Sequence, residues 1–134
     1  MLKLKRAYDP VSSEDGTRFL VERLWPRGLS KAKLRVDAWL KDVGPTTALR
    51  KWFSHDPEKW PQFRARYFRE LDSRPESWQP ILSAARRRRV TLVYSSHDEE
   101  HNNAVALKEY LQGKLGTRRP SRPVASDRTP RTSR

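Results

Sequence analysis

The stretch VTLVYSSHDEEHNNAVALKEYL, residues 90–111, holds the clearest strand of the chain and the segment that follows it. The apolar run over residues 90–94 is short and continuous, as in a strand that is buried on both faces. Ala104, Leu107 and Leu111 recur at helical spacing, which predicts an amphipathic helix over residues 99–112. A buried strand that leads directly into a helix is typical of an α/β domain.

The chain before this stretch continues the alternation of strands and helices. Apolar runs predict strands over residues 2–5 and 18–24, and a short edge strand within residues 36–43. Apolar stripes predict helices over residues 48–53 and 57–72, and a third that buries Trp78, Ile81, Leu82 and Ala85. The predicted fold is therefore a small α/β domain, residues 1–112, with a mostly parallel short sheet flanked by helices.

Two helix starts carry their own signals. Asp56 followed by Pro57 predicts an N-cap with proline at the first helical position. Ser73 and Glu76 have the spacing of a capping box, S-x-x-E.

Composition and charge exclude several classes of protein. The 134 residues include no cysteine, which excludes disulfides and thiolate zinc sites. The N-terminus, MLKLKRAYDP, lacks the apolar core of a signal peptide, and no apolar run approaches the roughly 20 residues that span a bilayer. We therefore expect a cytoplasmic protein without a membrane partner.

The formal net charge of +13 is unevenly distributed. Residues 113–134 carry seven basic side chains and one acidic side chain among Pro, Ser and Thr, with few apolar residues. Such a composition cannot bury enough surface to order itself, so it predicts a disordered basic tail.

Three segments together resemble one known family. LVERLWPRGLSK (20–31), AWLKDVGPTTALRKWFSHDPEKW (38–60) and VYSSHDEEHNNAVALKEYL (93–111) are similar to the YeaO-like branch of the domain of unknown function 488 family, DUF488. The resemblance covers residues 2 to about 112 and implies a small bacterial or archaeal α/β protein without an established activity. Some family members are labelled MarR-type transcriptional regulators, but the order of elements here supplies neither a recognition helix nor a β-hairpin wing.

The polar segment after the strand 90–94 is the first candidate site. If the strands 18–24 and 90–94 are parallel neighbours, ligands are expected outside their carboxyl ends. Arg23 and Arg27 would there face Asp98, His101, Asn102 and Asn103, with Trp25 as a wall of the site or as part of the core. We expect the two arginines to fix an anion and the two asparagines to orient the ligand or the loop. Asp98 and His101 would supply acid/base or hydrogen-bonding capacity. The alternative is a structural network in which the acidic residues only cap a helix.

The same segment also matches a metal motif. His97 to His101 reads H-x-x-E-H, the inverted form of a zinc-protease signature. His97 lies before the predicted helix begins, so it does not share a helix face with His101. The family more often has a basic residue at the position of His97. We therefore predict no metal and no cofactor.

Nucleic acid is the alternative partner. Three groups of basic residues would support salt-sensitive binding without base readout. They are Arg86, Arg87, Arg88 and Arg89, the basic face of the helix 57–72, and Arg118 and Arg119 in the tail. The leading hypothesis is a small anionic-ligand-binding or weakly enzymatic domain, and the rival is a basic nucleic-acid-associated protein.

Overall fold

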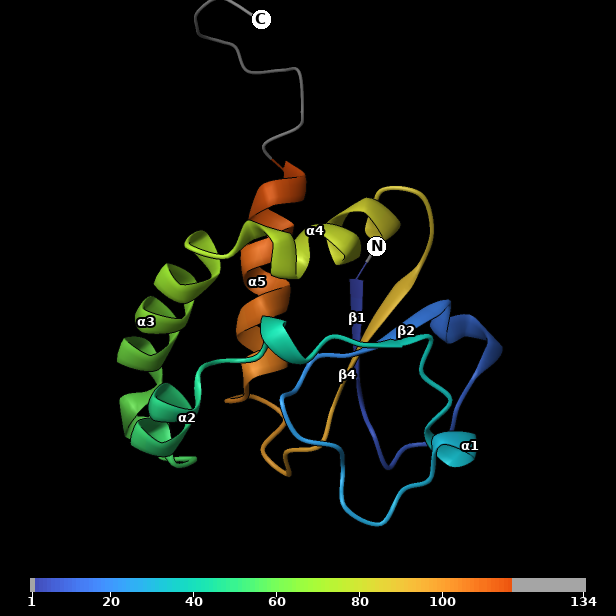
Figure 1. The fold of residues 1–134 in the computed structure, drawn as a ribbon, viewed down its shortest axis with the longest axis horizontal. Coiled ribbons are helices and arrows are strands. Elements are labelled where there is room, and N and C mark those ends of the chain that lie inside the picture. Colours follow the sequence, from blue (N-terminus) through green and yellow to red (C-terminus); the bar gives the residue numbers. More distant parts are fainter. Residues whose placement is uncertain (1, 117–134) are drawn as a thin grey trace, which may run out of the picture.

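Four parallel strands form the sheet of the domain in the computed structural model, which describes residues 2–116 (Figure 1). The strands are β1 (Leu2–Arg6), β2 (Thr17–Leu20), β3 (Ala38–Trp39) and β4 (Val90–Tyr94). Their order is β1-β4-β2-β3, so the most buried strand, β4, lies between β1 and β2. The predicted parallel sheet and the two-residue edge strand β3 are thereby confirmed.

Helices cover the two faces of the sheet unequally. They are α1 (Lys31–Leu34), α2 (Thr47–Phe53), α3 (Trp60–Asp72), α4 (Pro75–Ala85) and α5 (Asn103–Gly116), with short 3₁₀ turns η1 (Ser13–Asp15), η2 (Lys41–Val43) and η3 (Pro57–Lys59). Helices α2 to α5 pack together over one face, and α1 with the long connection after β2 lies on the other (Figure 1). Within residues 2–116, no helix is long and apolar enough to cross a membrane.

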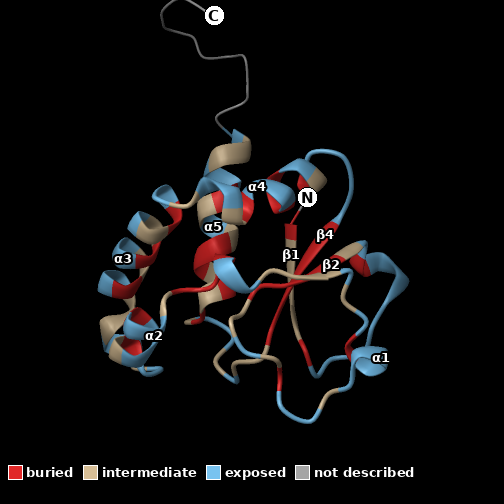
Figure 2. Ribbon diagram, in the orientation of Figure 1, coloured by how far each residue is buried: buried red, intermediate tan, exposed pale blue. Residues whose placement is uncertain are grey.

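Alternation along the strands explains why both faces can be covered. Leu92 and Tyr94 of β4 belong to the larger core under α2 to α5, whereas Val93 belongs to the smaller cluster with Leu20 and Leu34. Successive side chains of a strand point to opposite faces, so a continuous apolar run serves two cores. Figure 2 shows β4 and most of β2 buried at the centre of the domain, whereas β1 is mostly intermediate.

A buried ionic network around Asp15, just before β2, links β1 to β2. The Asp15 carboxylate is fully buried and accepts hydrogen bonds from Lys5 Nζ (2.8 Å), Arg18 (2.8 Å) and the Ser12 backbone N–H (3.1 Å). Arg18, itself 3 % exposed, also donates to the carbonyls of Leu34 and Arg35. Burial opposes ionisation of Asp15, but these hydrogen bonds outweigh it and hold its pKa below the ordinary value. The network joins β1, β2, η1 and the end of α1.

The prediction for the start of α3 is confirmed, whereas that for α4 is wrong. Asp56 caps the turn η3, which runs directly into α3, by accepting from the Glu58 backbone N–H (3.0 Å). The N-cap of α4 is Arg74, which has no capping side chain, and the Ser73 hydroxyl instead donates back to the Glu70 carbonyl. Ser73 still follows the path of α3, so it cannot adopt the extended backbone of an N-cap.

Two predicted boundaries also change. Strand β2 ends at Leu20 rather than at residue 24, because the chain turns away from β4 after Val21 donates to the Val93 carbonyl. Helix α5 begins at Asn103 and ends at Gly116, four residues later at each end than the predicted 99–112. Of the predicted tail 113–134, the first four residues are helical and the remainder lies outside the described residues.

Candidate functional site

The candidate site lies where β1, β2 and β4 end, on the side of the sheet that we call the carboxyl edge. Because the three strands are parallel, the loops after Arg6, Leu20 and Tyr94 leave the sheet at the same edge. The three segments that carry the family resemblance meet here. Asn103 Nδ2 donates to the Val21 carbonyl (2.7 Å), which joins the third segment to the first.

Glu22 is the central acidic group of the carboxyl edge. Its two carboxylate oxygens accept from the Ser95 backbone N–H (3.0 Å) and the Ser95 hydroxyl (2.8 Å). Burial raises the pKa of Glu22, although the hydrogen bonds from Ser95 and the charges of Arg50 and His55 partly offset this effect. The carboxylate of Glu22 therefore bridges the ends of β2 and β4 at some cost in solvation.

Two basic side chains of the second segment favour the ionised form of Glu22. Arg50, on α2, and His55, just after α2, are both exposed and both act on the charge of Glu22. Ser54 and His55 occupy the left-handed region of the backbone, with φ of 47° and 59°. For residues other than glycine this conformation costs roughly 1–2 kcal/mol each, and such strain is concentrated at functional sites.

His101 and Asp98 form a pair beside this group. Asp98 accepts from the backbone N–H groups of Glu100 and His101, both at 2.9 Å, and lies 3.0 Å from His101 Nδ1. The hydrogen bond from the Glu100 N–H, followed by those from His101, lowers the pKa of Asp98 despite partial desolvation. The imidazole of His101 stands edge-on to Trp60, with ring centroids 5.4 Å apart.

Aromatic rings connect His55 and His101. Phe53 lies between His55 and Trp60, with centroid distances of 6.4 Å and 5.9 Å. Trp60 in turn contacts His101. The carboxyl edge thus brings His55 and His101 to one aromatic cluster.

The two asparagines act within the protein. Asn102 is buried and caps α5, because its Oδ1 accepts from the Val105 N–H (3.0 Å) and its Nδ2 donates to the Asp98 carbonyl (2.8 Å). Asn103 holds the end of β2 through Val21. Both side-chain amides therefore fix the loop that carries Asp98 and His101.

The predicted arginines do not face that loop. Arg23 donates to the Pro45 carbonyl (2.8 Å) and lies 3.8 Å from Asp42, because Gly44 packs against its side chain and backbone. Arg27 is exposed, and its backbone carbonyl accepts from the Tyr8 hydroxyl. Trp25 belongs to the smaller core cluster, where it packs edge-on against Trp39. Within residues 2–116 neither arginine forms a hydrogen bond or ion pair with Asp98 or His101, and their role in holding an anion stays a prediction.

The metal motif and the nucleic-acid residues lie in different surroundings. His97 is exposed on the loop before α5, with its Nδ1 3.4 Å from Arg6, so it shares no helix face with His101. In the part of the chain that the structure describes, no three acidic or histidine side chains gather as metal ligands. Arg86 to Arg89 are exposed at the opposite, amino ends of the strands, and Arg118 and Arg119 lie outside the described residues.

Glu22, Arg50 and His55 were missed as site residues. The signal available for Glu22 was a carboxylate placed directly after an apolar strand run. For His55 it was the motif S-H-D-P, in which a histidine precedes a helix cap. Neither signal indicates that the two residues meet.

Comparisons with known proteins agree on the family. The model of the inactive DUF488-N3 subclade matches residues 1–128. The uncharacterized protein YeaO of Escherichia coli (strain K12) is 37% identical over 111 residues, which cover 83% of this chain and 96% of that protein. The uncharacterized protein Rv3073c of Mycobacterium tuberculosis (strain ATCC 25618 / H37Rv) is 34% identical over 113 residues, which cover 84% of this chain and 95% of that protein. No solved structure matches. The resemblance to YeaO-like proteins is thus confirmed, and the chain belongs to the DUF488 family, in its inactive N3 subclade.

Proposed function

We propose that the domain binds a small anionic ligand at the carboxyl edge and releases it unchanged. The observation that carries the proposal is the aromatic cluster at the carboxyl edge, in which Phe53 and Trp60 link the exposed His55 to His101. The charges of Arg50 and His55 also favour the ionised form of the half-buried Glu22 carboxylate. Arg50 and His55 take the anchoring role that the sequence assigned to Arg23 and Arg27.

The ligand's chemistry follows from the groups that remain available. A guanidinium group pairs with phosphate or carboxylate through two parallel hydrogen bonds. Glu22 uses one lone pair of each oxygen for Ser95, so the others can accept from a hydroxyl or N–H of the ligand. The rings of Trp60 and His101 offer an apolar side to the same molecule. A small anion that also carries a hydrogen-bond donor, such as a sugar phosphate or a nucleoside monophosphate, matches this set.

Binding without turnover is favoured over weak catalysis. Asp98, predicted as an acid or base, already accepts two backbone N–H groups and the ring of His101. The Ser95 hydroxyl donates to Glu22, and a carboxylate is a poor base for a serine hydroxyl. The description of the family as inactive supports the same conclusion.

A thermal-shift screen of the full chain tests the proposal. The probes are inorganic phosphate, a sugar phosphate, a nucleoside monophosphate and a dicarboxylate. We expect at least one probe to raise the melting temperature, and Arg50→Ser and His55→Ala to abolish the shift. Lys51→Ser is the matched control, because Lys51 is the exposed basic neighbour of Arg50 on α2.

Calorimetry then separates binding from stabilisation by salt. A probe that binds the wild type and Lys51→Ser equally, but neither site variant, supports the proposal. Equal binding by all four proteins, or conversion of the probe into a product, contradicts it.

A further inference from the structure

A basic surface lies at the amino ends of the strands, opposite the carboxyl edge and independent of the function proposed there. It consists of the exposed run Arg86 to Arg89, between α4 and β4, and of Arg35 at the end of α1. We call these five residues the amino-end arginines. The run and the loop before β2 are in direct contact, because the Thr17 N–H donates to the Arg89 carbonyl (3.0 Å). A Cβ placed on Gly16 would lie 2.3 Å from the same carbonyl oxygen, so the two segments touch closely.

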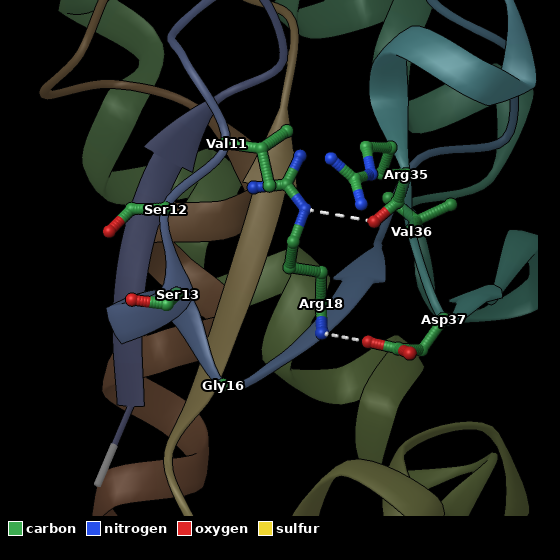
Figure 3. Close-up of a pocket in the computed structure, with 8 residues that line it drawn as sticks. All are labelled: Val11, Ser12, Ser13, Gly16, Arg18, Arg35, Val36 and Asp37. Atoms are coloured by element: carbon green, nitrogen blue, oxygen red, sulfur yellow. Dashed lines mark hydrogen bonds between the residues drawn. The ribbon is translucent and has the colours of Figure 1, made fainter.

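An open depression of about 660 Å³ adjoins this contact (Figure 3). Its lining residues are Val11, Ser12, Ser13, Gly16, Arg18, Arg35, Val36 and Asp37. The guanidinium groups of Arg18 and Arg35 both extend toward Val11, and the two serines line the side near Gly16 (Figure 3). The donors of Arg18 are already used by Asp15, Leu34 and Arg35. The exposed guanidinium group of Arg35 and the serine hydroxyls are donors of the kind that proteins use to contact phosphate.

The charges of this surface are not neutralised within the domain. Among residues 2–116, none of the amino-end arginines forms an ion pair or a side-chain hydrogen bond. The buried carboxylate below the depression, Asp15, is already paired with Lys5 and Arg18. Asp37 is the acidic residue of the lining, and one of its oxygens accepts from the Arg18 backbone N–H (2.7 Å).

The basic face of α3 differs in this respect. Arg64 is paired with Glu109, and the guanidinium group of Arg66 lies over the ring of Trp52, 4.2 Å from its centroid. Helix α3 therefore uses part of its positive charge within the protein, whereas the amino-end arginines do not.

We propose that the amino-end arginines and the adjoining depression bind the phosphate backbone of nucleic acid without reading its sequence. The depression has no aromatic lining on which a base could stack, which favours backbone contact. Val11 is the large exposed apolar residue of this lining, so the surface lacks the apolar face that membrane-bound segments insert. Helix α5 ends on the same side of the domain as the start of β4 (Figure 1). By sequence, residues 117–134 add six arginines against one aspartate.

Salt-dependent binding of the full chain to a short labelled DNA duplex tests the proposal by fluorescence anisotropy. Each phosphate contact contributes about 0.9 to the slope of log K against log salt concentration. The double variant Arg87→Ser/Arg88→Ser should therefore reduce the slope by up to about 1.8. Arg35→Gly should reduce it by about 0.9 without unfolding, since glycine tolerates the positive φ of 52° at this position.

Two charge-matched variants serve as controls. Arg66→Ser/Arg69→Ser removes two charges from α3, and Arg118→Ser/Arg119→Ser removes two beyond α5. Circular dichroism melting identifies any variant that is unfolded. A loss of slope confined to, or largest in, the amino-end variants supports the proposal.

Other outcomes overturn it. Equal losses in all three double variants would indicate attraction by net charge alone, and a loss confined to Arg118 and Arg119 would place binding beyond α5. The proposal is also contradicted if the wild type binds anionic lipid vesicles but not the duplex, or if it binds neither of them.

Discussion

Replacement of Asp15 by Asn should strongly destabilise the domain. The Asp15 carboxylate is fully buried and holds Lys5, Arg18 and the Ser12 N–H together. Asparagine keeps the shape but removes the charge, and its NH₂ group would face a cationic donor. The side chain of Arg18, 4% exposed, would then be an uncompensated buried charge. Breaking a buried ion pair in this way costs about 3–5 kcal/mol, a large part of the roughly 5–15 kcal/mol that stabilises a typical domain.

Urea unfolding followed by tryptophan fluorescence measures this cost at neutral pH. The paired variant Asp15→Asn/Arg18→Met should recover part of the loss, with a coupling energy of about 1–3 kcal/mol, because it also removes the stranded charge. The folded-state pKa of Asp15 lies below its ordinary value of 3.8, so its contribution is present above that value and is lost as the pH falls through the folded-state pKa. The difference between wild type and Asp15→Asn should therefore shrink in acid. A cost below about 1 kcal/mol, the level of a surface pair, or a difference independent of pH would refute the reasoning.

Four other substitutions, one of them at the mispredicted cap, are tested by the same unfolding assay. In Glu22→Gln the variant should gain stability relative to wild type as the pH rises. Burial raises the pKa of Glu22, so its contribution to the free energy of unfolding is present below the ordinary value of 4.5 and is lost as the pH rises through the folded-state pKa. The same pH dependence of stability in the wild type and in Glu22→Gln would contradict this. Tyr67→Phe leaves the Val43 carbonyl without its donor at a buried site and should cost about 1–3 kcal/mol, so an unchanged midpoint would exclude that role. Asn102→Ala removes the cap of α5 and should cost about 0.5–2 kcal/mol, whereas Ser73→Ala, at the mispredicted cap, should change stability by less than about 0.5 kcal/mol.

Helix and strand positions were predictable where the signal is local. The stripe of apolar residues in α3 and the apolar run of β4 each repeat over a few residues, and the observed elements follow them closely. The cap of η3 was predictable for the same reason, since Asp56 contacts a backbone group only two residues away. The cap of α4 was not predictable from local sequence, because the path of α3 holds Ser73 in a helical backbone conformation.

The candidate site was predictable only in part. That the loops after β2 and β4 share an edge followed from the parallel sheet, and this part is confirmed. Which side chains meet there depends on how each loop turns after its strand. Arg23 is turned toward Pro45 and Asp42 by packing against Gly44, and Glu22 instead reaches Ser95.

The sequence by itself determined the α/β alternation, the two apolar faces of the strands, the basic character of the chain and the family. These properties follow from side-chain spacing over a few residues and from composition, which folding does not change. Only the tertiary structure decided that Glu22 meets Ser95 and that His55 and His101 share an aromatic cluster at the carboxyl edge. It also decided that Asp15 is enclosed by Lys5 and Arg18. The physical reason is that these contacts join segments far apart in the chain, so they exist only after the helices and the sheet have packed and the loop directions are set.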